Sequence, residues 1–173
     1  MKFTDLSSSS TSDDHRNMNK MKLIEVLENF LGTKWQSLCT KHWKQESVEE
    51  LHGNIQKLKL YTTEDELKSD RFIELISRFC DKLSRINNPH ILSVGKKVLK
   101  LLLKENVNAS RTLQTVIQLT HNAFHATYEE TFVSIPCLLK CIDIILSSGA
   151  IPSLEDVKKL SSTISDIGKV SQM

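Results

Sequence analysis

The chain has few residues that interrupt helices and few that mark a disulfide-bonded fold. Among 173 residues only five are Gly, three are Pro and four are Cys. This composition favours long helices over a turn-rich β fold, and it lacks the cysteine density of a disulfide scaffold. The net charge of +2 is close to balance, so the chain has no overall field for nucleic acid or membrane.

The apolar residues also form no long continuous run. The longest apolar stretch, 135–146, contains Pro136, Lys140 and Asp143, whereas a membrane-spanning helix needs roughly 20 apolar residues in succession. The N-terminal segment lacks the apolar core of a secretory signal. We therefore expect a protein of the cytoplasm or nucleus with reduced thiols.

What the chain does have is an amphipathic helical pattern that restarts repeatedly between Met18 and Val170. No strand pattern separates the restarts, which predicts an all-α domain of about seven or eight helices over residues 18–170. Residues 1–17 are polar and Ser-rich, so they cannot bury enough apolar surface to offset the entropy of ordering. We expect a disordered tail there.

Capping residues and helix breakers predict where individual helices begin and end. The predicted N-caps are Ser47 with Glu50, Thr63 with Glu66, Ser110 and Ser153, and the predicted breaks fall at Gly32, Asn87-Asn88-Pro89 and Gly149. Residues 134–148 are apolar nearly all round, which is typical of a central buried helix.

Two aromatic residues, Trp35 and Trp43, belong to an apolar stripe with helical spacing. The other members of the stripe are Leu38, Cys39 and His42. The pattern predicts that both rings lie in the core. The alternative is an exposed aromatic anchor of the kind found in interfaces, if this segment packs elsewhere.

An internal similarity suggests repeats of helix pairs. Residues 98–110 (VLKLLLKENVNAS) align with residues 141–153 (CIDIILSSGAIPS), and an offset of this size is typical of HEAT or armadillo units. The stretch 138–160 (LLKCIDIILSSGAIPSLEDVKKL) also resembles the junction between two pentatricopeptide or tetratricopeptide units. These resemblances imply a right-handed stack of antiparallel helix pairs, an α-solenoid, used for binding.

A zinc site is one alternative that the residue types raise. His121 and His125 are four positions apart, as are Cys137 and Cys141, so each pair could share a helix face, and two His with two Cys could bind zinc tetrahedrally. Because Cys137 and Cys141 lie among aliphatic residues, the favoured interpretation is that they are small core residues.

The clearest surface feature is an arc of lysines on the helix predicted at 91–104. Lys96, Lys97, Lys100 and Lys104 share this arc. A solvated face is the ordinary interpretation; the functional one is a docking strip for an acidic or amphipathic protein segment. RNA is a second possible ligand, although aromatic residues for base stacking are scarce.

We therefore expect a non-enzymatic helical-repeat module or scaffold that binds protein partners. The chain has no Gly-rich phosphate loop and no signature around a nucleophile, so we expect no cofactor. Single-stranded RNA binding by a pentatricopeptide-like array is the alternative, followed by a zinc-stabilised bundle. The last predicted helix has no polar capping helix after it, which suggests completion by another subunit or a longer form.

Overall fold

The structure is a computed structural model, and it describes residues 22–32, 43–105, 107–125 and 134–171. All regular secondary structure in these ranges is helical, so the predicted all-α class is confirmed. The eight helices are α2 (Leu23–Leu31), α4 (Gln45–Lys59), α5 (Glu64–Leu67), α6 (Asp70–Leu83), α7 (Pro89–Leu102), α8 (Ala109–His125), α9 (Ile135–Ser147) and α10 (Leu154–Ser171). The predicted tail at 1–17 lies outside the described residues.

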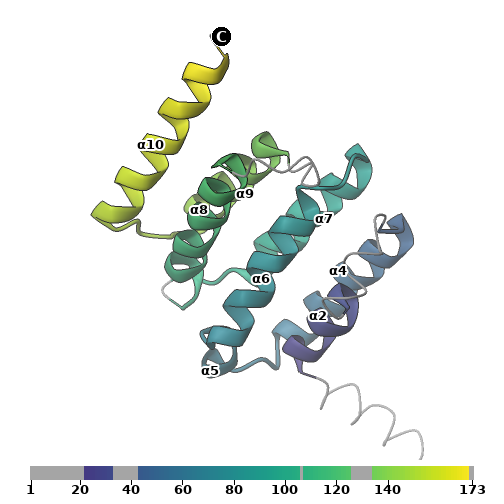
Figure 1. The fold of residues 1–173 in the computed structure, drawn as a ribbon. Helices are drawn as coiled ribbons and strands as arrows, with labels where there is room; N and C mark the ends of the chain where they lie inside the picture. Colours follow the sequence, from purple (N-terminus) through teal and green to yellow (C-terminus); the bar gives the residue numbers. More distant parts are fainter. Residues whose placement is uncertain (1–21, 33–42, 106, 126–133, 172–173) are drawn as a thin grey trace, which may run out of the picture.

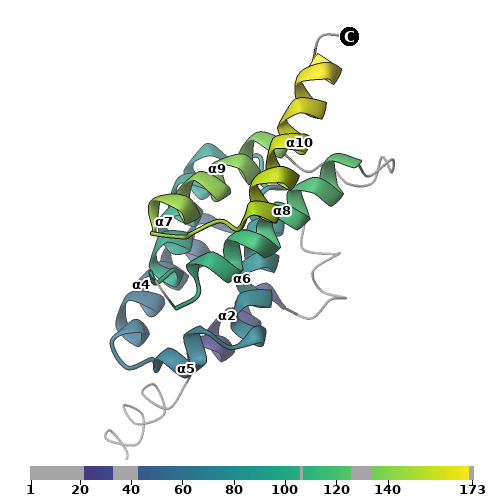
Figure 2. The ribbon, with the colours of Figure 1, turned by 90° about the vertical axis from the view of Figure 1, so that its left-hand side faces the viewer.

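The longer helices lie in two rows (Figure 1). α2, α6, α8 and α10 contact one another in that order, and α4, α7 and α9 form the second row. Contacts of α2 with α4, of α6 with α7 and of α8 with α9 join the rows. α10 stands at the far end of the molecule from α2, and its C-terminal half extends beyond the other helices (Figure 2).

The helices of the first row run in the same direction. Backbone and side-chain contacts join equivalent points of neighbours, as in Glu28–Arg71 (3.1 Å) between α2 and α6 and His121–Thr163 (3.0 Å) between α8 and α10. These partners are separated by 43 and 42 residues in sequence. Residues that face each other in successive first-row helices are therefore about 42 positions apart in the sequence.

The core is centred on α6, whose buried face is wider than that of any neighbour. Its buried residues are Phe72, Ile73, Leu75, Ile76, Ser77, Phe79, Cys80 and Leu83. Phe79 stacks on Trp43 with ring centroids 5.1 Å apart, and Trp43 packs edge-on against Phe30 at 4.9 Å. This aromatic cluster holds α2 against α6 through a segment that precedes α4.

Several helix ends follow the predicted capping chemistry. Gly32 has φ of 73° and its N–H donates to Glu28 O at 2.9 Å, so α2 ends where a residue tolerating the left-handed region stands. Thr63 accepts from Glu66 N at 3.3 Å. Ser153 and Asp156 exchange bonds of 3.1 and 3.0 Å at the start of α10, which is a reciprocal capping box.

Two predicted caps are wrong. α4 begins at Gln45, and its N-cap residue Lys44 makes no side-chain capping bond, so Ser47 lies inside the helix. Ser110 lies inside α8, where its hydroxyl accepts from Ile151 N at 2.9 Å. The residue that organises this corner is Asn108, a position that the capping pattern did not single out.

Residues 134–148 do not form the predicted central buried helix. α9 buries Cys137, Leu138, Cys141, Ile142 and Ile145 on one face and exposes Lys140, Asp143 and Leu146 on another. α9 lies in the second row and its outer side faces solvent. The apolar residues on that side are therefore exposed and are not part of the core. The central helix is α6.

Candidate protein-interaction surfaces

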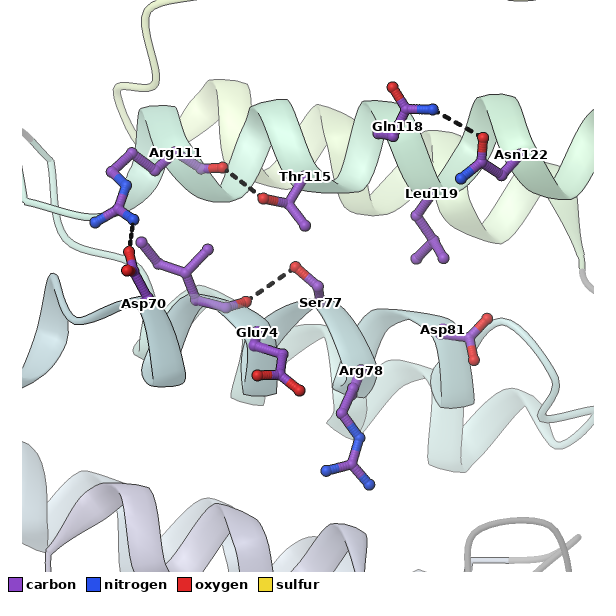
Figure 3. Close-up of a pocket in the computed structure, with 11 residues that line it drawn as sticks. Asp70, Glu74, Ser77, Arg78, Asp81, Arg111, Thr115, Gln118, Leu119 and Asn122 are labelled. Atoms are coloured by element: carbon purple, nitrogen blue, oxygen red, sulfur yellow. Dashed lines mark hydrogen bonds and ion pairs between the residues drawn. The ribbon is translucent and has the colours of Figure 1, made fainter. Parts of the chain in front are cut away.

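A groove of about 490 Å³ lies between α6 and α8 (Figure 3). The lining residues are Asp70, Ile73, Glu74, Ser77, Arg78, Asp81, Arg111, Thr115, Gln118, Leu119 and Asn122. On each helix they recur every three or four positions, which places them on one helix face. The groove thus follows from two parallel helices that present polar faces side by side.

The floor of the groove is apolar, and most of its α8 wall carries uncharged polar groups. Ile73, one of the lining residues, is buried, and Leu119 points from α8 toward α6 (Figure 3). Gln118 Nε2 donates to Asn122 Oδ1 at 2.8 Å, so the two amides lie along one wall. Amide and hydroxyl groups in such a position can pair with the backbone of a bound segment.

The charged groups around the groove are already balanced by neighbours. Arg111 pairs with Asp70 and also donates to Lys68 O at 2.6 Å. Arg78 turns its guanidinium away from the groove (Figure 3) and donates to Gly32 O at 3.1 Å, at the C-terminus of α2. The groove therefore lacks the concentrated charge of a phosphate-binding or catalytic site.

A smaller hollow of about 270 Å³ continues this surface between α8 and α10. Its lining residues are Gln114, Thr115, Gln118, Glu155, Asp156 and Lys159. Thr115 and Gln118 line both cavities. The two hollows form one polar surface that crosses α6, α8 and α10 of the first row.

Lys96, Lys97 and Lys100 of the predicted lysine arc lie on α7, in the second row and away from the groove, whereas Lys104 follows the end of that helix at Leu102. Lys97, Lys100 and Lys104 are exposed and Lys96 is half-buried. Lys104 pairs with Glu64 at 2.9 Å. Burial, with a smaller contribution from the nearby charge of Lys104, lowers the pKa of Lys59 at the end of α4. The arc is solvated, and its proposed partner remains a prediction.

Of the two tryptophans, Trp43 fills the core and Trp35 lies outside the described residues. Trp43 is 8% exposed and contacts the rings of Phe30 and Phe79. Its location corrects the alternative of an exposed anchor at this position, since a ring enclosed on both sides has no face left for a partner.

The four residues of the zinc alternative lie in two separate places. The rings of His121 and His125 on α8 are tilted relative to each other, with centroids 4.4 Å apart. Both face α10, where His121 bonds to Thr163 and His125 lies 3.7 Å from Asp166. Within the described part of the chain, no three His, Cys, Asp or Glu side chains are arranged to hold a metal ion. The geometry does not unite the histidines with the cysteines.

The cysteines form a thiol cluster in the core. Cys80, Cys137 and Cys141 are buried and not joined by disulfides. A hydrogen bond with Cys141, together with burial, raises the pKa of Cys137 far above its ordinary value. For Cys141, the bond with Cys137 lowers the pKa, but the bond with Cys80 and burial outweigh it and raise the pKa. Such thiols are poor nucleophiles.

The groove residues were missed in the sequence because nothing about them is unusual there. Thr115, Gln118 and Asn122 read as the solvated face of an amphipathic helix. The signal that could have identified them is their spacing on the face opposite the buried Leu113, which repeats the polar face of α6. Polar faces become a groove only when the packing of two helices is known.

Comparison with protein-family models, with curated proteins and with solved structures finds no significant match for this chain. Among the helices that the structure describes, none combines the length and apolar character needed to cross a membrane.

Proposed function

We propose that the protein is a non-enzymatic helical-repeat module that binds a segment of a partner protein in the α6–α8 groove. The groove supports this proposal because it has an apolar floor at Leu119 and a polar wall at Gln118 and Asn122. An extended segment placed there would pair its backbone with the amides and one apolar side chain with the floor.

The repeat character of this proposal rests on the recurring separation of contacts. Pairs between successive first-row helices, such as Asp70–Arg111 and Gln118–Lys159, are 41 residues apart. This spacing agrees with the sequence offset of 43 and is in the range of HEAT or armadillo units. We infer an α-solenoid in which the first row forms the binding face.

The acidic residues of the groove contribute only a small preference for a partner segment with a basic residue. Asp70 and Glu74 are each paired with an arginine, Arg111 and Arg71 respectively. Asp81 forms an ion pair with Arg85 at 3.3 Å and is only partly exposed. A lysine or arginine of the partner would add an exposed ion pair worth about 0.2–1 kcal/mol, which sets register more than affinity.

A random-peptide display selection on the full chain tests this function. We expect the selected peptides to bind the Thr115→Arg variant roughly tenfold more weakly or worse, which corresponds to a loss of at least ~1.4 kcal/mol of binding free energy. The reason is that Thr115 lines both hollows, so the introduced arginine side chain would occupy space in both. Ser93→Arg is the matched control, because Ser93 is an exposed hydroxyl residue on α7. Peptides that bind both variants as tightly as the wild type would contradict the proposal.

RNA binding is the alternative outcome of a parallel titration. A salt-dependent affinity for single-stranded RNA that falls on Lys97→Glu and Lys100→Glu would move the function to nucleic acid, because phosphate contacts release counterions.

A further inference from the structure

The outer side of α7 carries positive charge and no negative charge. The helix contains no Asp or Glu, and from its second turn onward its exposed residues are Ser93, Lys97 and Lys100. Steps of three and four positions place these residues on one line along the helix, opposite the side that faces the core. Lys104, just after the helix end, is exposed at the next step of four. Lys97, Lys100 and Lys104 form a basic strip.

Two lysines of the basic strip have no carboxylate partner. Among the described residues neither Lys97 nor Lys100 forms an ion pair, whereas Lys104 pairs with Glu64 at 2.9 Å. Lys57 on α4 is also exposed, and it too forms no ion pair within the described ranges. Unbalanced charges of one sign create a surface potential that attracts a partner of the opposite sign.

Neighbouring helices bound the basic strip on both sides (Figure 2). α4 carries three glutamates in its first half and two lysines, Lys57 and Lys59, in its second half. Burial and, to a smaller extent, the charge of Lys104 lower the pKa of Lys59, so the positive end of α4 lies near the end of the strip. On the other side, Lys140 of α9 pairs with Asp143 at 3.4 Å. The unbalanced positive charge is therefore concentrated on α7 and the end of α4.

The side chains around the strip favour an acidic polypeptide over RNA. Binding of single-stranded RNA relies on aromatic side chains for base stacking, and α4, α7 and α9 contain no Phe, Tyr or Trp. Val94 and Leu101 of α7 are instead only partly buried, and they lie along one flank of the strip. A polypeptide segment would place carboxylates on the lysines and an apolar side chain on this flank.

We propose that the basic strip of α7 binds an acidic segment of a partner protein. Lys97 and Lys100 are separated by about 4.5 Å of axial rise, a spacing that a partner helix matches with carboxylates three or four positions apart. The contacts are exposed ion pairs, so the segment binds weakly and reversibly, and its affinity falls as salt is added.

The basic strip and the α6–α8 groove lie on different rows of the molecule. The strip is on α7 in the second row, and the groove is between two helices of the first row (Figure 2). One chain would therefore hold two partner segments at the same time, as a scaffold does. Binding at the strip does not depend on the proposed ligand of the groove.

Fluorescence anisotropy with a labelled helical peptide, in which glutamates recur every three or four positions, tests the strip. At low salt we expect the wild-type chain to bind it, and Lys97→Glu/Lys100→Glu to weaken binding by roughly tenfold, because two exposed attractions become repulsions. Lys158→Glu/Lys169→Glu is the matched control, since both lysines are exposed on α10 and the net charge changes equally. Equal losses in the two variants, or a wild-type chain that does not bind, would overturn the proposal.

Charge complementarity is tested by changing the peptide. A peptide with lysines in place of the glutamates should bind the Lys97→Glu/Lys100→Glu variant more tightly than the wild type, and Lys97→Gln/Lys100→Gln should weaken binding of the glutamate peptide only a few-fold. A lysine peptide that binds both chains equally would contradict a role for these charges. Unchanged helical circular dichroism confirms that the variants fold.

Two further measurements separate the strip from other sites and ligands. Thr115→Arg, in the α6–α8 groove, should leave binding of the glutamate peptide unchanged; a loss there would place the acidic segment in the groove and overturn the proposal. A single-stranded oligouridylate of equal charge should compete poorly with the peptide. Tighter binding of this RNA, lost on Lys97→Glu/Lys100→Glu, would assign the strip to nucleic acid instead.

Discussion

α6 and α10 are both amphipathic helices, yet they are held in the molecule in opposite ways. α6 buries two phenylalanines, Phe72 and Phe79, and is packed against helices of both rows. α10 buries Asp156 and Thr163, and leaves its aliphatic stripe, which includes Ile164, partly exposed. One helix is covered by its own chain, whereas the other retains an apolar flank for which the described structure provides no cover.

The comparison shows that an apolar stripe predicts a helix but not what covers it. Both stripes have the 3.6-residue period, and nothing in their spacing distinguishes the buried one from the exposed one. The difference lies in the polar positions. Thr163 bonds to His121 of α8 and so fixes this polar face of α10 against α8, whereas Asp156 caps the start of α10 through Ser153 N.

The largest expected effect is a difference in stability between equivalent substitutions in α6 and α10. Phe79→Ala should lower the free energy of unfolding by about 3–5 kcal/mol, because it empties a fully buried aromatic site. Ile164→Ala should change it by less than about 0.5 kcal/mol, because Ile164 is half exposed. Urea denaturation measures both. Equal losses would show that α10 is as integral to the core as α6.

A second substitution tests the corner between α7 and α8. Asn108 is fully buried; it donates to Leu102 O at 2.9 Å and accepts from Lys104 N at 2.8 Å. Asn108→Ala should cost about 2–3 kcal/mol in urea denaturation, because two buried backbone groups lose their partners.

The matched control at that corner is Ser110→Ala. Ser110 accepts a single bond at the partly exposed Ile151 N, so we expect a loss of about 1 kcal/mol or less. A larger loss for Ser110 than for Asn108 would mean that the link to α10, and not the α7–α8 corner, limits stability.

The polar contact of α10 should have a smaller effect. Thr163→Val keeps the shape of the side chain but removes the bonds to His121 and to Lys159 O. We expect a loss of about 1 kcal/mol, and faster amide exchange in α10 than in α6. Thr112→Val is the control, because the buried Thr112 hydroxyl has no hydrogen-bond partner in the described structure. That substitution should be neutral or stabilising.

At pH 7 the raised pKa values of the buried thiols should slow their reaction with labelling reagents without changing the stability of the fold. Because the native pKa values of Cys137 and Cys141 are raised above the ordinary 9.0, their stabilising contribution is complete below that value and declines as the pH rises above it. Urea denaturation at increasing pH should show this decline, and Cys137→Ala/Cys141→Ala should reduce it. Rapid labelling of both native thiols at pH 7 would contradict the buried cluster.

Most of the helices could be predicted from the sequence, because periodicity and caps such as Thr63 and Ser153 are local signals. The errors arose where local signals compete. Ser47 and Ser110 have capping chemistry, yet neighbouring residues start the helices. The prediction that α9 is a central buried helix is wrong because the sequence does not distinguish an apolar face exposed to solvent from an apolar face in the core.

The candidate sites were less predictable, because each depends on two segments. The α6–α8 groove needs the relative placement of Gln118 and Leu119 against α6. The lysines of α7 could be located on an exposed arc but not assigned a ligand.

Hydrogen exchange of the full chain tests the central contrast between α6 and α10 most directly. We predict that amides of α10 exchange faster than those of α6, because α6 is buried in the core and α10 is largely exposed. Protection of α10 equal to that of α6 would contradict the view that α10 is held mainly by a few polar contacts while α6 is held by the core.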